Sequence, residues 1–255
     1  MTPKYLVYTI LVLFILPARS FAQSENIHSS MVHYGVSDAD SVYGYLTYPE
    51  KENKLPAIIL IHEWWGLNDD IKAKADMFAR EGYVALAVDL YHGRHTTDPA
   101  IARKLATSVR NNMEAAFQNL NAAISFLKKT GKIDPDRIGS IGWCFGGGWS
   151  YQMAKNNLGT KVSVIYYGFF NPEDDLSKMR ADILGHFAEK DRAIKIDDVI
   201  QFQAKLKTLS GDHEIYIYPN TTHGFASRPN SNPNYNKKAA EAAWARTLKF
   251  LKKHL

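Results

Sequence analysis

The sequence predicts an α/β fold in which a mostly parallel sheet is covered on both faces by helices. Strand-like and helix-like patterns alternate along the chain, and most of the strands are continuous apolar runs, which is typical of parallel strands buried on both faces. The composition, 45% hydrophobic and 22% charged residues, is that of a globular protein with a large core. The chain has no internal repeat, low-complexity tract or long linker, so a single large domain is expected.

The first half of the sheet is expected from four successive patterns. Residues 42–48 alternate between apolar and polar side chains, as in a half-exposed strand. The run PAIILIHE at residues 56–63 is the first fully buried strand. A helix follows, which Asn68 can cap and Gly82 can end. The run YVALAVDL at residues 83–90 is the next buried strand.

The second half continues the alternation. Asp98 and Pro99 predict the cap and first residue of a helical region that extends to Lys129, with a break expected at residues 111–112. The remaining strands are expected at residues 136–144, 161–168, 181–188 and 213–218, and the remaining helices at residues 196–209 and 236–253. In such sheets the reactive groups gather beyond the carboxyl ends of the strands.

Cys144, the only cysteine of the chain, follows one of these strand ends. The sequence GWCFG, residues 142–146, has the form G-x-nucleophile-x-G, which is typical of the strained strand-to-helix turn called the nucleophile elbow. A helix N-terminus aimed at the thiol favours the thiolate. The alternative is that Cys144 is an inert residue of the core beside a tight turn.

Two more residues fit the order nucleophile, acid, base that this elbow predicts. Asp191 lies just past the strand at residues 181–188, and His223 lies just past the strand at residues 213–218. An aspartate in a loop is often only a turn residue, and a single histidine is often structural. The order and placement of all three residues together predict a Cys144–Asp191–His223 triad.

The chain resembles the dienelactone hydrolase family of α/β-hydrolases. The resemblance is carried by IHEWWG, VDLYHGR, GWCFGGG, IYYG, YPNTTHGF and the C-terminal AAEAAWARTLKFLKKHL, which together span residues 44–255. It implies the α/β-hydrolase fold and a carboxylic ester hydrolase with a cysteine nucleophile. It also implies a role for Glu63, because in the family a glutamate at this position contacts the resting thiol and helps to take its proton when substrate binds.

The remaining site residues are expected around this triad. The backbone N–H groups of Phe145 and Trp64 are expected to form the oxyanion hole. The residues expected to contact substrate are Trp65, Tyr91, Trp143, Tyr167, Phe225, Arg94 and Arg228. No metal or organic cofactor is expected, because the histidines show no ligand spacing such as H-E-x-x-H.

The sequence departs from the family pattern at the arginines that hold a substrate carboxylate. The pattern has one arginine four residues after the base and another two residues after the tyrosine of DLY. Here Ser227 stands four residues after His223 and Arg228 five, while Arg94 stands three residues after Tyr91. Either both arginines still reach the substrate, or they are solvated surface residues and the carboxylate site is altered.

The first 22 residues are interpreted as a secretory signal. Lys4 precedes a mostly apolar run at residues 5–16, and Ser20 and Ala22 are small residues where a signal peptidase needs them. The run is shorter than the roughly 20 residues that span a bilayer, although an uncleaved anchor is the alternative. Residues 23–255 would then be the mature domain, without a membrane anchor. Cleavage lowers the formal net charge of +5 by two, and the scattered basic residues do not favour binding to nucleic acid.

The expected location is the bacterial periplasm or the medium. Residues 220–222, Asn-Thr-Thr, match the N-glycosylation pattern, and a glycan there would crowd His223. This favours a cell that does not modify the sequence, such as a bacterium.

The predicted function is hydrolysis of a lactone or small ester by a monomer, through a thioester on Cys144. Three alternatives stay open: an esterase for neutral substrates on the same scaffold, an exported binding protein without activity, and a thiol redox sensor. The single cysteine disfavours the sensor, because no second thiol can resolve its oxidised form.

Overall fold

An eight-stranded sheet organises the chain in the order β1-β2-β4-β3-β5-β6-β7-β8. The computed structural model describes residues 26–50, 54–227 and 231–255. The strands are β1 (Ile27–Ser37), β2 (Asp40–Pro49), β3 (Leu55–Ile61), β4 (Val84–Val88), β5 (Ile133–Trp143), β6 (Val162–Tyr166), β7 (Asp182–Ala188) and β8 (Glu214–Tyr218). The neighbouring strands from β4 to β8 in this order pair in parallel, whereas the pairs β1–β2 and β2–β4 are antiparallel. The mostly parallel sheet is therefore confirmed.

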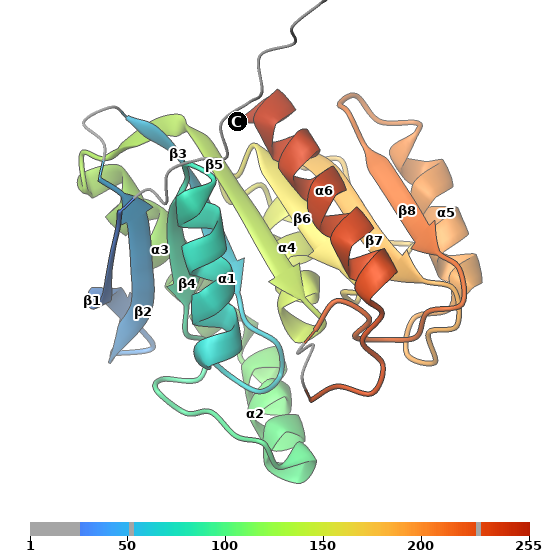
Figure 1. Ribbon diagram of the computed structural model, residues 1–255, viewed down its shortest axis with the longest axis horizontal. Helices are drawn as coiled ribbons and strands as arrows, with labels where there is room; N and C mark the ends of the chain where they lie inside the picture. The colour runs from blue at the N-terminus through green and yellow to red at the C-terminus, as the bar shows by residue number, and fades with distance from the viewer. Residues whose placement is uncertain (1–25, 51–53, 228–230) are drawn as a thin grey trace, which may run out of the picture.

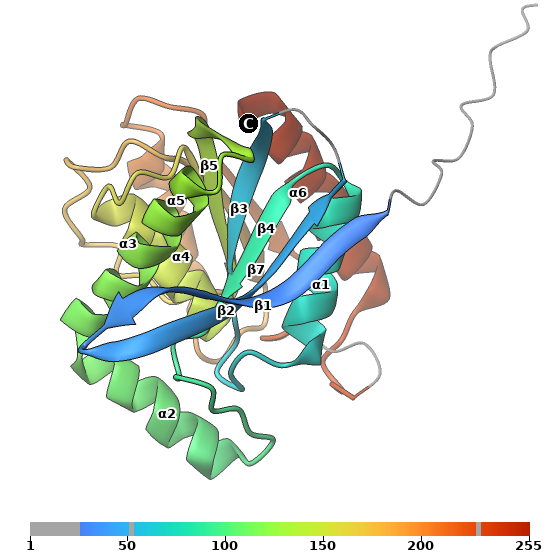
Figure 2. The ribbon, with the colours of Figure 1, turned by 90° about the vertical axis from the view of Figure 1, so that its left-hand side faces the viewer.

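Helices cover both faces of the sheet, as expected. They are α1 (Asp69–Arg80), α2 (Pro99–Asn111), α3 (Met113–Lys129), α4 (Phe145–Lys155), α5 (Ile196–Leu206) and α6 (Lys237–His254). Helices α1 and α6 lie on one face, and α3, α4 and α5 lie on the other (Figures 1 and 2). The predicted break at residues 111–112 is confirmed, because Asn112 ends α2 and its side chain caps α3. No helix in the described residues is long and apolar enough to cross a membrane.

The N-terminal strand β1 was not predicted. It forms a hairpin with β2 through Asp38 and Ala39, whose φ values of 49° and 66° are those of a two-residue turn of type I′. β1 is the edge strand, and only Tyr34 and Ser37 of its residues are fully buried. An edge strand that is mostly exposed leaves no apolar run in the sequence, which explains the omission.

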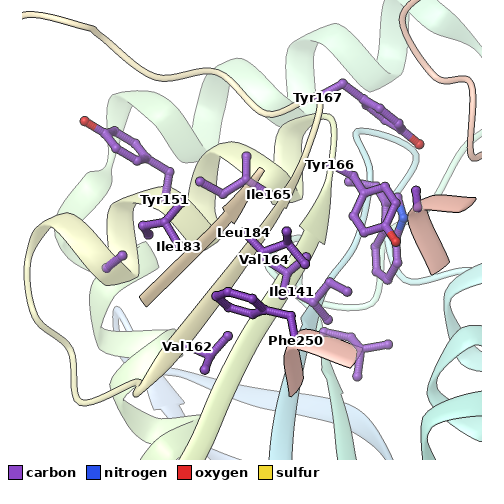
Figure 3. Close-up of a cluster of buried hydrophobic side chains, with 14 of the residues drawn as sticks. Ile141, Tyr151, Val162, Val164, Ile165, Tyr166, Tyr167, Ile183, Leu184 and Phe250 are labelled. Carbon is purple, nitrogen blue, oxygen red and sulfur yellow. The ribbon is translucent and has the colours of Figure 1, made fainter. Parts of the chain in front are cut away.

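Strand β6 shows how the two layers of the core meet the sheet. The side chains of β6 alternate between the two faces of the sheet, and its aliphatic residues pack against those of β5 and β7 (Figure 3). On one face, the hydroxyl of Tyr166 is hydrogen-bonded to that of Thr247 in α6 at 2.7 Å. On the other face, Ser140 is hydrogen-bonded both to Ser163 and to Ser150 of α4. The centre of the sheet is therefore fixed from both sides, and its carboxyl edge is a rigid support for the loops that follow.

A buried histidine ties the last strands to the C-terminal helix. The ring nitrogens of His186 in β7 bond to the Tyr218 hydroxyl at 2.9 Å and to the Thr247 hydroxyl at 3.0 Å. Burial lowers the pKa of His186 to about 3, and the positive charge of Arg246 lowers it further. The imidazole is therefore neutral at physiological pH, and it links β7, β8 and α6 beneath the loops of the site.

Candidate active site

Cys144 occupies the turn between β5 and α4. Its backbone has φ 53° and ψ −114°, a conformation that L-residues rarely adopt. Gly142 permits this turn, since a Cβ there would lie 2.0 Å from the carbonyl oxygen of Gly146. The Cys144 N–H donates to the Tyr166 carbonyl at 2.9 Å, which fixes the turn against β6. This strained strand-to-helix turn has the backbone geometry of the nucleophile elbow that the sequence predicts.

A glycine also lets the elbow sit directly against the neighbouring strand. A Cβ on Gly146 would lie 2.1 Å from the carbonyl oxygen of Ile61, at the end of β3. The first turn of α4 can therefore touch the end of β3, where the loop that contains Glu63 and Trp64 begins. This close approach brings the turn of Cys144 together with the loop that is expected to contribute to the oxyanion hole.

Asp191 and His223 form a hydrogen-bonded pair beside the elbow. His223 Nδ1 and Asp191 Oδ2 are 2.8 Å apart, and the Asp191 side chain is almost fully buried while that of His223 is 27% exposed. The other carboxylate oxygen of Asp191 accepts the N–H groups of Ala193 and Ile194. These two bonds hold the carboxylate in one orientation, so that it fixes the imidazole ring and its tautomer.

His223 is in electrostatic contact with Cys144. Burial alone would lower the pKa of His223, but the hydrogen bond to Asp191 and the interaction with the Cys144 side chain outweigh burial and raise that pKa to about 10. The structure thus brings together the three residues of the predicted triad. A histidine that a carboxylate orients beside a thiol is an arrangement that can make the thiol nucleophilic.

Glu63 lies in the same site, and its partner is a serine. The carboxylate is buried, and its Oε2 accepts a hydrogen bond of 2.6 Å from the hydroxyl of Ser227. Ser227 is itself buried. The position four residues after the base, where the family pattern has an arginine, therefore supplies a neutral donor to Glu63 in this chain.

His62 shapes this part of the site, and the sequence analysis did not select it. Its ring is fully buried, with Nδ1 2.6 Å from the Glu63 carbonyl oxygen and Nε2 accepting the Leu90 N–H at 3.1 Å. Burial lowers the pKa of His62, so the ring is neutral and Nδ1 carries the proton. The ring also stacks on Phe145. The sequence feature that could have identified His62 is a polar residue at the end of an otherwise apolar strand.

A cavity of about 240 Å³ opens at the thiol. Glu63, Trp64, Trp65, Cys144 and His223 contribute to its walls, together with residues of the segment that follows His223. Phe145 is the first residue of α4, so its N–H has no acceptor within the helix, as is needed of an oxyanion-hole donor. Trp64 lines the cavity beside Trp65, with ring centroids 4.7 Å apart.

Tyr167 and Phe225 are buried beneath the site and do not line this cavity. The Tyr167 ring packs at 5.1 Å against His223 and at 5.3 Å against Phe225. These residues therefore support the His223 ring from below. Tyr91 is also buried, and its ring packs against both His62 and Phe145.

Two predicted substrate residues lie elsewhere, and a third cannot be placed. Trp143 is buried against Tyr166 and lines a separate groove between α1 and α6. Arg94 donates from its Nε to the Tyr91 carbonyl and lines a different cavity from that of Cys144. Trp143 points away from the cavity of Cys144 because side chains alternate between the two faces at the end of β5. Arg94 is directed elsewhere by a turn in which Asp89 accepts the N–H groups of Tyr91 and Gly93. Arg228 lies outside the described residues.

The parallel sheet, the elbow after β5 and the acid–base pair after β7 and β8 together define an α/β-hydrolase. The sequence model of the dienelactone hydrolase family matches residues 42–255, and the chain belongs to that family. It is accordingly a hydrolase of carboxylic esters.

Similar proteins cover nearly the whole chain. Protein usf of Aquifex pyrophilus is 33% identical over 220 residues, which are 84% of this chain and 94% of that protein. The "Probable 2-oxo-3-(5-oxofuran-2-ylidene)propanoate lactonase" of a Bradyrhizobium species is 28% identical over 244 residues, which are 91% and 97% of the two chains. The fold matches a dienelactone hydrolase-like promiscuous phosphotriesterase from metagenomic libraries, with a TM-score of 0.82, 20% identity and coverage of 89% and 98%.

Proposed function

We propose that this protein hydrolyses a lactone or small ester through a thioester on Cys144. The observation that carries the proposal is the juxtaposition of a strained, partly exposed thiol with a histidine whose partner is a buried aspartate. The family and the lactonase named among the similar proteins support the substrate class.

The first half of the reaction forms the thioester. His223 takes the proton of the Cys144 thiol, and the sulfur attacks the carbonyl carbon of the ester. The N–H groups of Phe145 and Trp64 bind the oxyanion of the tetrahedral intermediate. The C–O bond then breaks, and His223 gives its proton to the leaving oxygen, which in a lactone stays attached to the acyl group.

The second half restores the enzyme. Water attacks the thioester while His223 takes a proton from it, and the C–S bond breaks to release the carboxylic acid and the thiolate. The thiolate regains its proton from His223. Asp191 keeps the ring oriented and stabilises the imidazolium in both halves. In this proposal Glu63, which accepts the hydrogen bond of Ser227, acts on the resting thiol before substrate arrives.

The test uses residues 23–255 as wild type and as Cys144→Ala. The substrates are an enol lactone that carries a carboxylate and 4-nitrophenyl acetate. We expect hydrolysis of at least one substrate by the wild type and none by the variant. A rapid acid quench should yield a peptide containing Cys144 that is heavier by the mass of the acyl group. Equal activity of the two proteins, or no acylated peptide, would rule out the thioester.

A second candidate is an esterase for neutral substrates, which the Ser227–Glu63 contact favours. A neutral residue stands where the family pattern has an arginine, and Arg94 does not share the cavity of Cys144. Comparing a charged substrate with an uncharged one of the same shape separates the two candidates.

We further propose that residues 1–22 direct export and are removed, and that the mature protein is a monomer in the periplasm or the medium. The apolar run after Lys4 and the small residues at positions 20 and 22 support the signal. Mass spectrometry of the protein from fractionated bacteria should show an N-terminus at Gln23, and light scattering should give the mass of one chain. An intact N-terminus in the membrane fraction would contradict the export signal.

A further inference from the structure

The groove between α1 and α6 has the size of a small-molecule site. These two helices lie on the same face of the sheet (Figure 1), and the groove has a volume of about 320 Å³. It stays open because the facing helices carry alanines here, Ala73 on α1 and Ala240 on α6. Apolar atoms dominate its walls, and Met77 of α1, which lines it, is 44% exposed. An apolar ligand in the groove would remove this surface from water.

The groove is bounded, so a small molecule fits it better than a segment of another protein. Its floor includes Trp143 and Tyr166, whose ring centroids lie 5.3 Å apart. The two helices are joined by a contact between Phe78 of α1 and Trp244 of α6, with ring centroids 4.7 Å apart. Tyr235, which precedes α6, contributes another wall at the carboxyl edge of the sheet. With three large aromatic lining residues besides Tyr166, the groove is suited to an aromatic ligand.

The charged residues of the groove are already compensated, which favours an uncharged ligand. The Lys74 ammonium lies over the Trp143 ring, 5.2 Å from its centroid. Asp70 belongs to the first turn of α1, where the helix dipole stabilises a carboxylate. Glu241 has the Lys237 ammonium at 3.8 Å. An ionised ligand would have to replace these interactions, whereas an uncharged aromatic one only buries apolar surface.

The groove shares walls with the cavity of Cys144 at three points. At each point one residue lines the groove, and the residue adjacent to it in the chain lines the cavity of Cys144. The three pairs are Trp143 with Cys144, Ala226 with Ser227, and Tyr235 with Asn234. Ser227 in turn donates its hydrogen bond to Glu63. A ligand that packs against the groove side of these pairs therefore acts on the backbone of the other cavity.

We propose that the groove between α1 and α6 binds an uncharged aromatic molecule, which acts as an effector of the cavity of Cys144 without entering it. By packing against Ala226 and Tyr235, the ligand holds Ser227 and Asn234 in place, so that less ordering remains to be done when substrate binds. The binding of this molecule is independent of the proposed function, whereas its effect on KM rests on that function.

The binding experiment uses two fluorescent probes of similar shape, the uncharged N-phenyl-1-naphthylamine and the anionic 1-anilinonaphthalene-8-sulfonate. The proteins are residues 23–255 as wild type, Cys144→Ala, Ala240→Phe, which places a ring in the groove, and the control Ala245→Phe. The control adds the same ring to α6 at an exposed position outside the groove. We expect the uncharged probe to bind the wild type, Cys144→Ala and Ala245→Phe alike. Its Kd should rise about tenfold or more in Ala240→Phe.

The kinetic experiment measures ester hydrolysis with and without saturating N-phenyl-1-naphthylamine. We expect the probe to lower KM about fivefold for the wild type and for Ala245→Phe, a coupling at the lower end of the usual range. The KM of Ala240→Phe should not respond to the probe.

Four results would overturn the inference. Competitive inhibition by the uncharged probe would place it in the cavity of Cys144, and equal affinity for the wild type and Ala240→Phe would place it elsewhere. Tighter binding of the anionic probe would show that the groove selects a charge, and binding without any change in KM would show that the two cavities are not coupled. Failure of the proposed function looks different, because the wild type would then hydrolyse no ester, or Cys144→Ala would hydrolyse it, while the binding titrations would still give their result.

Discussion

The Ser227 hydroxyl donates a hydrogen bond of 2.6 Å to Glu63 Oε2, although the two residues are 164 positions apart in the chain. Both side chains are buried at the cavity of Cys144. The bond joins the loop after β3 to the segment that contains His223. The position of the carboxylate near the thiol therefore depends on a residue that has no reactive chemistry of its own.

Substitution Ser227→Ala should weaken both activity and stability. It leaves a buried carboxylate oxygen without its donor, which costs about 1–3 kcal/mol of the free energy of unfolding. Urea unfolding measures the loss, and ester hydrolysis should fall at the same time because Glu63 is no longer held. Ser210→Ala, at an exposed position, is the control and should leave both unchanged. Wild-type stability and activity in Ser227→Ala would show that Glu63 is positioned by other contacts.

Substitution Asp191→Asn should lower the pKa of His223 from about 10. Burial lowers this pKa, and the hydrogen bond to the Asp191 carboxylate is the largest influence that raises it, so removal of the carboxylate leaves burial less opposed. NMR titration of the His223 ring measures the shift. The value of kcat/KM should fall by up to about 10,000-fold, since the ring loses its fixed tautomer. Asp197→Asn, an exposed acid in the first turn of α5, should change neither quantity. An unchanged titration would mean that Asp191 does not act on the ring.

Much of the fold could be predicted because parallel strands buried on both faces leave continuous apolar runs. β3, β4, β6 and β7 all follow this pattern, and the strand ends then pointed to Cys144, Asp191 and His223. Edge strand β1 left no such run, because most of its side chains face solvent.

The contacts that complete the site could not be predicted, since they depend on distances between remote segments. The Ser227–Glu63 bond follows only from the meeting of two loops. Trp143 shows the opposite case, because it precedes Cys144 in sequence but alternation turns it to the far face of β5.

Substitution Gly146→Ala should be far more damaging than its helical position suggests. Alanine normally stabilises a helix by about 1 kcal/mol relative to glycine. Here the added Cβ would lie 2.1 Å from the Ile61 carbonyl oxygen, so α4 and β3 would have to separate at the elbow. We expect a loss of about 3 kcal/mol or more in thermal or urea unfolding, together with loss of hydrolysis. Gly148→Ala is the matched control in the same helix, because its nearest neighbour, the Phe169 carbonyl oxygen, is 3.2 Å away. Similar losses in the two variants would show that the close approach is not the cause.

His186 should make the protein less stable in mild acid. Its pKa is about 3 in the folded protein, chiefly through burial, and about 6.5 in an unfolded chain. The unfolded state therefore binds more protons below pH 6.5, and the free energy of unfolding falls by about 1.4 kcal/mol for each pH unit between 6.5 and 3.

The measurement of this effect is urea unfolding at pH 7 and pH 5 for the wild type and for His186→Gln. Between these pH values the wild type should lose about 2 kcal/mol more than the variant. His62 shifts in the same direction and is present in both proteins, so the comparison removes its contribution. The raised pKa of His223 has the opposite effect on stability, and this effect lies above pH 6.5: the stabilisation is lost as the pH rises toward 10.

If His186→Gln does not fold, NMR of the wild type gives the same information, because the His186 ring should stay neutral at pH 5. A ring that takes up its proton near pH 6.5, or equal pH dependence in the two proteins, would contradict the neutral bridge between Tyr218 and Thr247.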